Sequence, residues 1–167
     1  MTKYFVPEPE TLEELKSLYR KLAMLHHPDR GGSEDAMKAV NSEFDILFPR
    51  LKNVHKNKEG VKYERETEES PDFFKDLIAE LMKMEDIVIE VIGCFVWVTG
   101  NTKVYKEELK AMKFNWHSEK FAWYLKPDWY VKYGSKSYSF SEIRSMYGTS
   151  GKVNSKGKDK LDDSDVA

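Results

Sequence analysis

The chain has 167 residues, of which 40% are hydrophobic and 34% charged, and its formal net charge is -2. This length allows one domain or two small ones with modest cores, and the near-neutral charge gives no general reason to expect binding to a polyanion. The single cysteine, Cys94, excludes an intrachain disulfide and a thiolate metal cluster. The longest apolar stretch, IVIEVIGCFVWV, is interrupted by Glu90 and is too short to span a bilayer. We therefore expect a cytoplasmic protein.

Helical spacing dominates the first part of the chain. Two apolar stripes are visible, formed by Leu15, Leu18, Tyr19, Leu22 and Leu25 and by Met37, Val40, Phe44 and Leu47. Thr11 is a predicted N-cap, and the first helix must end before Pro28. The second helix is predicted to begin at Ser33 and to end at Pro49. Residues 1–52 are therefore predicted to form an antiparallel helical hairpin.

The pattern changes after this hairpin. Residues 53–69 carry many charges of both signs and little apolar material, which predicts a solvated linker. Ser70 and Pro71 then predict the start of a third, amphipathic helix. Residues 149–167 are rich in Gly, Ser, Lys and Asp, and we expect a disordered tail there.

Alternating hydrophobicity begins after Asp86. IVIEVIG and CFVWVTG predict two strands with a reversal at Gly93, and a helical stretch through Leu109 follows. Two further strands flank a polar turn at His117, and SYSFSEIRSMYG predicts a short last helix. Residues 70–148 should thus hold the amphipathic helix, a small ββαββ domain and the final helix, and the fold class is α+β.

A His-Pro-Asp turn joins the two helices of the hairpin, within LAMLHHPDRGGSED. Pro28 fixes its own backbone and restricts His27, while Asp29 can hydrogen-bond the backbone of the turn. Gly31 and Gly32 allow the positive dihedral angles needed to enter the next helix. A rigid tip is predicted, although a plain helix connection would use the same residues.

Basic residues precede this tip. Lys16 and Arg20 are four residues apart, so they lie on one side of the first helix, and Lys21 is beside them. A small basic surface leading to the turn is predicted, with an ordinary solvated face as the alternative. His26 is interpreted as a partly buried helix-end residue. No metal site is expected, because the nearby histidines and Asp29 lack a recognisable ligand spacing.

The stretch YRKLAMLHHPDRGGSEDAMKAVNSEFDIL resembles the J domain of DnaJ-type co-chaperones in its YRKLA helix, its His-Pro-Asp loop and its N-x-x-F-x-x-L pattern. The HPDRGG variant is similar to the short J domains of polyomavirus tumour antigens. The resemblance implies docking on a DnaK-type chaperone and stimulation of its ATP hydrolysis, with no cofactor. The chaperone-binding residues that it implies are Lys16, Tyr19, Arg20, Lys21, His27, Pro28, Asp29 and Arg30.

The chain departs from this family at its start. A J domain usually begins with a short helix beside the hairpin, but Pro7 and Pro9 argue against a helix here. The first helix is predicted to be missing or reduced to an extended strip with Tyr4 and Phe5. We therefore expect a fragment of residues 1–52 to fold poorly unless that strip packs.

All four tryptophans lie after residue 86, in a stretch from Ile87 to Gly148 with nine Lys or Arg against six Asp or Glu. Basic groups among aromatic rings suit single-stranded nucleic acid, because bases stack on exposed rings and cations follow the phosphates. A small sheet also needs large rings for its core, and these alternate as core residues should: Trp97, Phe114, Trp116, Phe121 and Trp123. Candidate contacts to nucleic acid or a client are Lys103, Lys106, Lys110, Lys113, Trp116 and Trp123.

The stretch LKAMKFNWHSEKFAWYL also resembles small ββαββ domains of mobile-element proteins and, more loosely, the HARP-type domain of annealing helicases. This resemblance implies that the second module selects an unknown client, such as a nucleoprotein complex. One alternative is a nucleic-acid-binding adaptor with a purely structural hairpin, and another is peptide binding at a sheet edge. An enzyme is not expected, because no phosphate loop, nucleophile motif, paired carboxylates or metal spacing is present.

Overall fold

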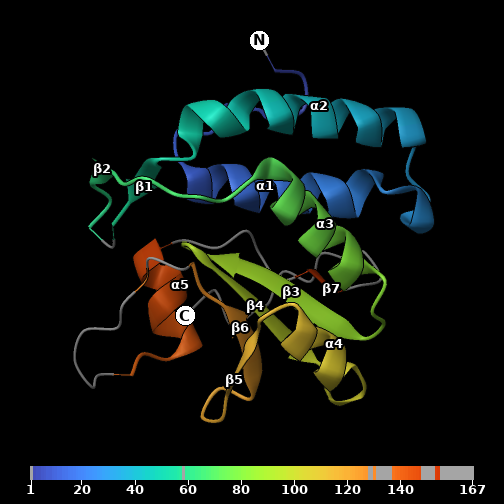
Figure 1. Cartoon of the computed structure of the whole chain (residues 1–167), viewed down its shortest axis with the longest axis vertical. Helices are drawn as coiled ribbons and strands as arrows, with labels where there is room; N and C mark the ends of the chain where they lie inside the picture. The colour runs from blue at the N-terminus through green and yellow to red at the C-terminus, as the bar shows by residue number, and fades with distance from the viewer. Residues whose placement is uncertain (1, 58, 128–129, 131–136, 148–152, 155–167) are drawn as a thin grey trace.

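The structure is a computed structural model that describes residues 2–57, 59–127, 130, 137–147 and 153–154. Two antiparallel helices, α1 (Leu12–His26) and α2 (Glu34–Leu51), form a helical layer, and an antiparallel sheet lies beneath it (Figure 1). Helix α3 (Pro71–Met82) packs on both α1 and α2. The predicted α+β class and the helical hairpin are confirmed.

The helix starts follow the predicted caps. The hydroxyl of Thr11 accepts from the Glu14 amide, that of Ser33 from the Ala36 amide, and that of Ser70 from the Phe73 amide, each within 3.3 Å. The predicted end at Pro49 is wrong, because α2 continues to Leu51. Proline removes a single helical hydrogen bond, and so close to the end of a helix this loss is tolerated.

Residues 2–10 form no helix, and the predicted extended strip packs on the hairpin. Phe5 is fully buried, with its ring 6.5 Å from that of Phe44. The Glu43 carboxylate accepts hydrogen bonds from the amides of Lys3, Tyr4 and Phe5, at 2.8, 2.9 and 3.3 Å. The strip thus packs on α2 through one buried ring and one carboxylate.

The predicted linker holds a β-hairpin instead. Strands β1 (Val54–Lys56) and β2 (Lys62–Glu64) pair antiparallel, and β1 packs against α1. His55 is fully buried between them and α1, with Nδ1 2.8 Å from a Glu13 carboxylate oxygen and Nε2 3.1 Å from the Arg65 carbonyl oxygen. The segment is therefore not a plain linker, although most of residues 53–69 are solvent-exposed, as predicted. Its lysines pair at the surface with Glu14, in the first turn of α1, and with Glu10 just before it.

The sheet contains the predicted ββαββ unit. Its strands are β3 (Ile87–Ile92), β4 (Phe95–Gly100), β5 (Asn115–His117) and β6 (Ala122–Leu125), and between β4 and β5 lie η2 (Lys103–Tyr105) and α4 (Lys106–Ala111). The order is β5-β6-β4-β3-β7. Every neighbouring pair is antiparallel. At Gly100, with φ of +96°, a Cβ would lie 2.6 Å from the Asp86 carbonyl oxygen, which fixes glycine at the exit from β4.

The fifth strand, β7 (Val153–Asn154), lies within the predicted disordered tail. It pairs with β3, so the expectation is wrong at these two residues. Without β7, β3 would be an edge strand with unpaired backbone groups, and an extended segment can pair with such an edge. The rest of the tail, residues 149–152 and 155–167, lies outside the described residues.

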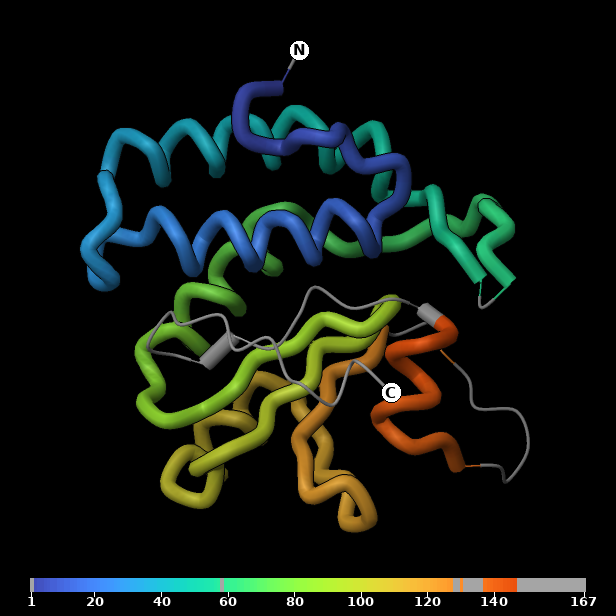
Figure 2. Tube along the Cα trace, turned by 180° about the vertical axis from the view of Figure 1, so that it is seen from behind, coloured from blue at the N-terminus to red at the C-terminus, as the bar shows by residue number. Residues whose placement is uncertain are grey.

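One buried core connects the two predicted modules. It includes Leu15 and Tyr19 of α1, Phe74 of α3, and Ile87 and Ile89 of β3, and α1 packs directly on β3. The final helix α5 (Phe140–Tyr147) packs beside the sheet (Figure 2). It covers the face opposite α1, where the Phe140 and Trp97 rings lie 5.0 Å apart. The chain therefore folds as a three-layer body, with helices on both faces of the sheet.

The predicted alternation of core aromatics holds only in part. Trp97, Phe114 and Trp123 are buried, whereas Trp116 is 47% exposed and Phe121 is 76% exposed. Trp116 belongs to the edge strand β5 and packs its ring 5.5 Å from that of Trp123. Phe121 has a φ of +49° in the β5–β6 turn. The alternation breaks because the turn residue has no strand geometry.

Candidate functional site

The His-Pro-Asp turn forms the tip of the helical hairpin. His27 ends α1, with its amide bonded to the Ala23 carbonyl, and Pro28 opens the short helix η1 (Pro28–Arg30). The His27 ring Nδ1 accepts a hydrogen bond from the Asp29 amide at 3.3 Å. The His27 side chain is 23% exposed and that of Asp29 is 79% exposed. The tip therefore presents an imidazole and a carboxylate with a fixed backbone beneath them.

Two glycines close this tip. Gly31 has the predicted positive φ, +80°, and its amide bonds to the Pro28 carbonyl. Gly32 does not share this conformation, but a Cβ on Gly32 would lie 2.2 Å from the His26 carbonyl group. The glycine pair is needed for one left-handed residue and one close backbone approach, rather than for two positive angles.

The predicted basic surface is largely covered. Arg20 is fully buried and Lys16 is 7% exposed, while Lys21 is exposed. The expectation that Lys16 and Arg20 face solvent is therefore wrong for this arrangement of the chain. The physical reason is that α1 packs on β3 and α3 along that side. Of the three basic residues, only Lys21 is exposed, and it lies in the second half of α1.

Lys16 and Tyr19 have specific partners beneath this cover. The Lys16 ammonium pairs with the Glu69 carboxylate and lies 5.2 Å from the centre of the Phe74 ring. The Tyr19 hydroxyl donates to the Asn41 side-chain oxygen at 2.9 Å, across the hairpin. Tyr19 thus connects α1 to α2, and Lys16 connects α1 to the segment before α3.

Arg30 lies on the other side of the turn, beside a cavity of about 500 Å³ between the turn and the end of α3. Its three guanidinium nitrogens are buried and have no hydrogen-bond partner among the described residues. Burial lowers the pKa of Arg30 below its usual value. The cavity also borders His27, Asp29 and Lys83, so a cationic group is present next to the exposed tip.

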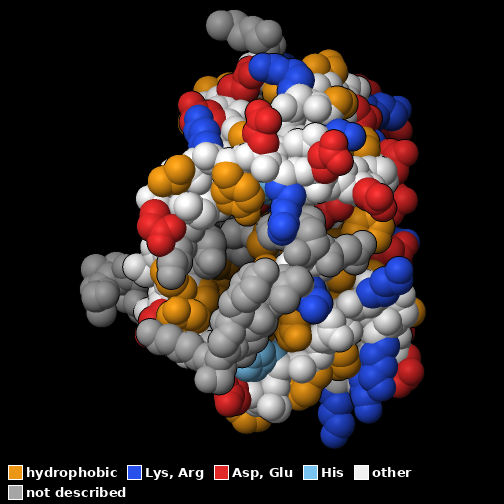
Figure 3. All heavy atoms as spheres, turned by 60° about the vertical axis from the view of Figure 1, so that its left-hand side comes forward, with side chains coloured by type: hydrophobic (Ala, Val, Ile, Leu, Met, Phe, Trp, Pro, Cys, Tyr) orange, Lys and Arg blue, Asp and Glu red, His pale blue; other side chains and the backbone are white. Residues whose placement is uncertain are grey.

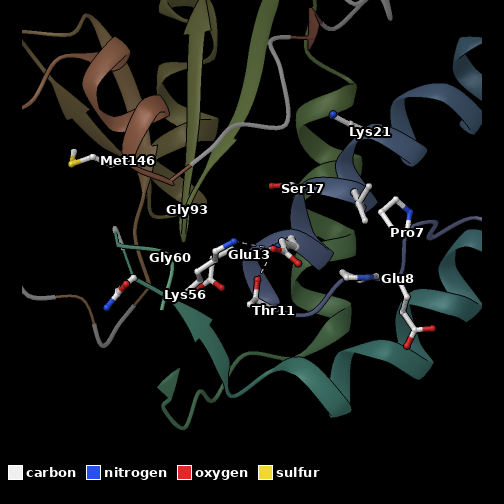
Figure 4. Close-up of a pocket in the computed structure, with 14 residues that line it drawn as sticks. Pro7, Glu8, Thr11, Glu13, Ser17, Lys21, Lys56, Gly60, Gly93 and Met146 are labelled. Atoms are coloured by element: carbon white, nitrogen blue, oxygen red, sulfur yellow. Dashed lines mark hydrogen bonds and ion pairs between the residues drawn. The ribbon is translucent and has the colours of Figure 1, made fainter. Parts of the chain in front are cut away.

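A second cavity, of about 470 Å³, lies beside the first half of α1 (Figure 4). Glu13 and Ser17 border it from α1, Lys56 from the β1–β2 hairpin, and Gly93 from the β3–β4 turn. Within the described ranges, no group of three or more His, Cys, Asp or Glu side chains could hold a metal ion. The charged side chains that border the cavity come from the N-terminal part of the chain, such as Glu13, and from the β1–β2 hairpin, with Lys56.

The candidate lysines of the second module lie around α4. Lys103, Lys106, Lys110 and Lys113 are all exposed, as are Glu107 and Glu108 on the same short helix. Trp116 is partly exposed, but Trp123 is buried and cannot meet a ligand without rearrangement. Figure 3 shows Lys and Arg side chains gathered at the lower right, on the sheet half, whereas both signs are mixed over the helical half.

Comparison with known proteins places the first part of the chain. It is 43% identical over 53 residues to Chaperone protein DnaJ of Acetobacter pasteurianus and 38% identical over 59 residues to Chaperone protein dnaJ A6 of Oryza sativa subsp. japonica. These matches cover 29% and 32% of this chain but only 14% of each relative. The N-terminal region carries a J domain of the DnaJ type. Residues 2–10, which precede α1, form no helix.

A viral relative is also found. The chain is 40% identical over 37 residues to the Small t antigen of Budgerigar fledgling disease virus, which covers 22% of this chain and 26% of that protein. This match fits the similarity of the HPDRGG variant to tumour antigens. No family model matches the chain. No solved structure matches it either.

Sequence reasoning missed several residues that shape the J domain. Glu43 holds the N-terminal strip, Glu69 pairs with Lys16, and Asn41 accepts from Tyr19. Asn41 is part of the N-x-x-F-x-x-L pattern, so its role was open to prediction. Glu69 lies among the many charges of the predicted linker, and no local signal marks it.

None of the helices in the described ranges combines the length and the apolar character that a membrane span needs.

Proposed function

We propose that this protein is a J-domain co-chaperone that docks on a DnaK-type chaperone and stimulates its ATP hydrolysis. It regulates an ATPase in the cytoplasm and is not itself an enzyme. The observation that carries this proposal is the His-Pro-Asp turn, in which Asp29 is 79% exposed above a backbone held by Pro28 and Gly31. The matches to DnaJ-type chaperones support it.

The turn offers the chemistry that docking requires. Asp29 presents a carboxylate, and His27 presents a ring whose orientation is fixed by the Asp29 amide. Lys21, exposed in the second half of α1, adds a positive charge on the same hairpin. Opposite charges on two partners speed their encounter and lose strength as salt rises. Docking through this tip should therefore be fast at low ionic strength and weaker at high ionic strength.

Single-turnover ATP hydrolysis by a DnaK-type chaperone tests the proposal. The full-length protein should accelerate hydrolysis, and His27→Gln should abolish the acceleration. His26→Gln is the matched control, because His26 packs its ring 5.2 Å from Tyr4 on the helix side of the turn. No acceleration by the wild type with any of several partner chaperones would contradict the proposal.

The sheet unit is proposed to select the client. Support comes from β5, which pairs with β6 alone among the described strands, and from two exposed rings, Trp116 in β5 and Phe121 in the turn that follows it. An extended client segment could pair with this edge. A second candidate function is binding of single-stranded nucleic acid, favoured by the same rings and by the four exposed lysines around α4.

A further inference from the structure

The side of α1 that carries Lys16 and Arg20 is covered by the chain itself. Arg20 is fully buried, and Lys16 is 7% exposed. The cover consists of β3 and α3, which both pack on α1, while Lys21, in the second half of α1, and Asp29, in the turn, stay exposed. A partner that approached α1 from this side would meet the C-terminal part of the protein first.

The covering segment supplies an acidic partner of its own. Glu69 lies just before α3 and pairs with the Lys16 ammonium, and Phe74 in the first turn of α3 places its ring 5.2 Å from the same ammonium. The Lys16 and Glu69 side chains are only 9% and 20% exposed. Glu69 thus forms with Lys16 the ion pair that an acidic group on another protein would otherwise form.

We infer that the C-terminal unit and a DnaK-type chaperone compete for this side of α1, so that the described arrangement is a closed, autoinhibited state of the J domain. The inference rests on the proposed function. When a binding-competent state is populated only in part, the apparent affinity falls by that fraction. Weakening the closed state should therefore lower the concentration needed for half-maximal stimulation and leave the maximum unchanged.

Cys94 gives a native probe of this closed state. It follows Gly93 in the β3–β4 turn, and Gly93 borders the same cavity as Glu13 and Ser17 of α1 (Figure 4). Burial, followed by the Glu13 carboxylate, raises the pKa of the Cys94 thiol to about 12. The thiolate is the reactive form, so alkylation should be slow while the sheet rests on α1 and faster when the two separate.

The test compares Glu69→Gln with Glu68→Gln in the full-length protein. Glu68 is exposed and adjacent, so it is the matched control. The first readout is the rate of Cys94 alkylation by N-ethylmaleimide at pH 8, without any chaperone. Lys16→Gln is included in this readout, because the Glu69 charge raises the pKa of the Cys94 thiol and the Lys16 charge lowers it. Loss of the Lys16 charge alone would slow alkylation, whereas opening of the closed state should accelerate it in both variants. The second is single-turnover ATP hydrolysis by a DnaK-type chaperone over a range of protein concentrations. We expect Glu69→Gln to accelerate alkylation and to reduce the half-maximal concentration, each by roughly threefold to tenfold.

The outcomes separate the inference from the proposed function. Both effects in Glu69→Gln, absent in Glu68→Gln and lost from the ATPase readout when His27→Gln is added, would support competition. An unchanged half-maximal concentration, with stimulation by the wild type intact, would overturn the competition and leave the co-chaperone function standing. Absence of stimulation by the wild type and both Glu variants would overturn the proposed function, and the inference with it.

Discussion

Arg144 of α5 donates two hydrogen bonds to the Glu90 carboxylate of β3, at 2.6 and 2.9 Å. The two side chains are 14% and 5% exposed, so the pair is largely withdrawn from water. A carboxylate inside a sheet is costly unless it is paired and hydrogen-bonded. This pair therefore fixes α5 against the face of the sheet that α1 does not cover.

Replacing Arg144 should destabilise the whole protein. Arg144→Met leaves the Glu90 carboxylate buried without its cation, and breaking such a pair costs about 3–5 kcal/mol. The double variant Glu90→Met/Arg144→Met should recover most of that loss, because no buried charge remains. Urea unfolding of the three proteins measures both effects. Equal stability of Arg144→Met and the wild type would show that the pair contributes nothing.

Glu43→Gln should loosen the N-terminal strip. Burial acts to raise the pKa of Glu43, but hydrogen bonds from the Tyr4, Lys3 and Phe5 amides and the charge of Lys3 outweigh it, and the pKa is lowered. Loss of these charge-assisted bonds should cost about 1–2 kcal/mol. Glu34→Gln, on the exposed start of α2, is the control. Thermal unfolding at pH 7 measures the difference.

The same residue predicts an acid dependence. A carboxyl group whose pKa is lowered on folding stabilises the protein above its unfolded value, about 4.3, and this contribution is lost as pH falls through the folded value. The stability gap between wild type and Glu43→Gln should therefore be constant above about pH 5 and shrink below about pH 4. A gap independent of pH would contradict the assignment of the three amide contacts.

Tyr19→Phe should reduce the loss of stability in alkali. Burial, followed by the charges of Asp45 and Asp76, raises the pKa of the Tyr19 hydroxyl. The unfolded chain releases that proton near pH 10 and the folded chain does not, so stability falls as pH rises above about 10. The variant should lose about 1 kcal/mol at pH 7, because the bond to Asn41 is gone, and show a shallower decline above about pH 10. If stability declines with pH as steeply in Tyr19→Phe as in the wild type, another titrating group causes the alkaline loss of stability.

Local signals in the sequence account for most elements of the fold, but not for the β1–β2 hairpin or for β7. The caps Thr11, Ser33 and Ser70 each accept a backbone hydrogen bond, because capping involves residues three positions apart. Strands β3 and β4 follow from alternation and from the reversal at Gly93. These features depend on near neighbours, which a single sequence contains in full.

The covering of the J domain depends on distant neighbours and could not be predicted. Lys16 and Arg20 have the spacing of a solvated helix face, and nothing near them signals that Glu69, 53 residues away, pairs with Lys16. The periodicity of a helix identifies its faces but not what packs on them. For the same reason the charged segment around His55 has the composition of a linker, although its charges are matched by those of α1.

The lysines around α4 give a last prediction, on nucleic acid. If Lys103, Lys106, Lys110 and Lys113 bind phosphates, changing all four to Gln should flatten the salt dependence of binding to a single-stranded oligonucleotide. Removal of one lysine–phosphate interaction should reduce the log–log slope by about 0.7. Four other exposed lysines, changed together, are the control: Lys3, Lys38, Lys56 and Lys83. Fluorescence anisotropy at several salt concentrations measures the slopes. If both quadruple variants keep the wild-type slope, the α4 lysines are a solvated face, and protein clients become the sole candidates for the sheet unit.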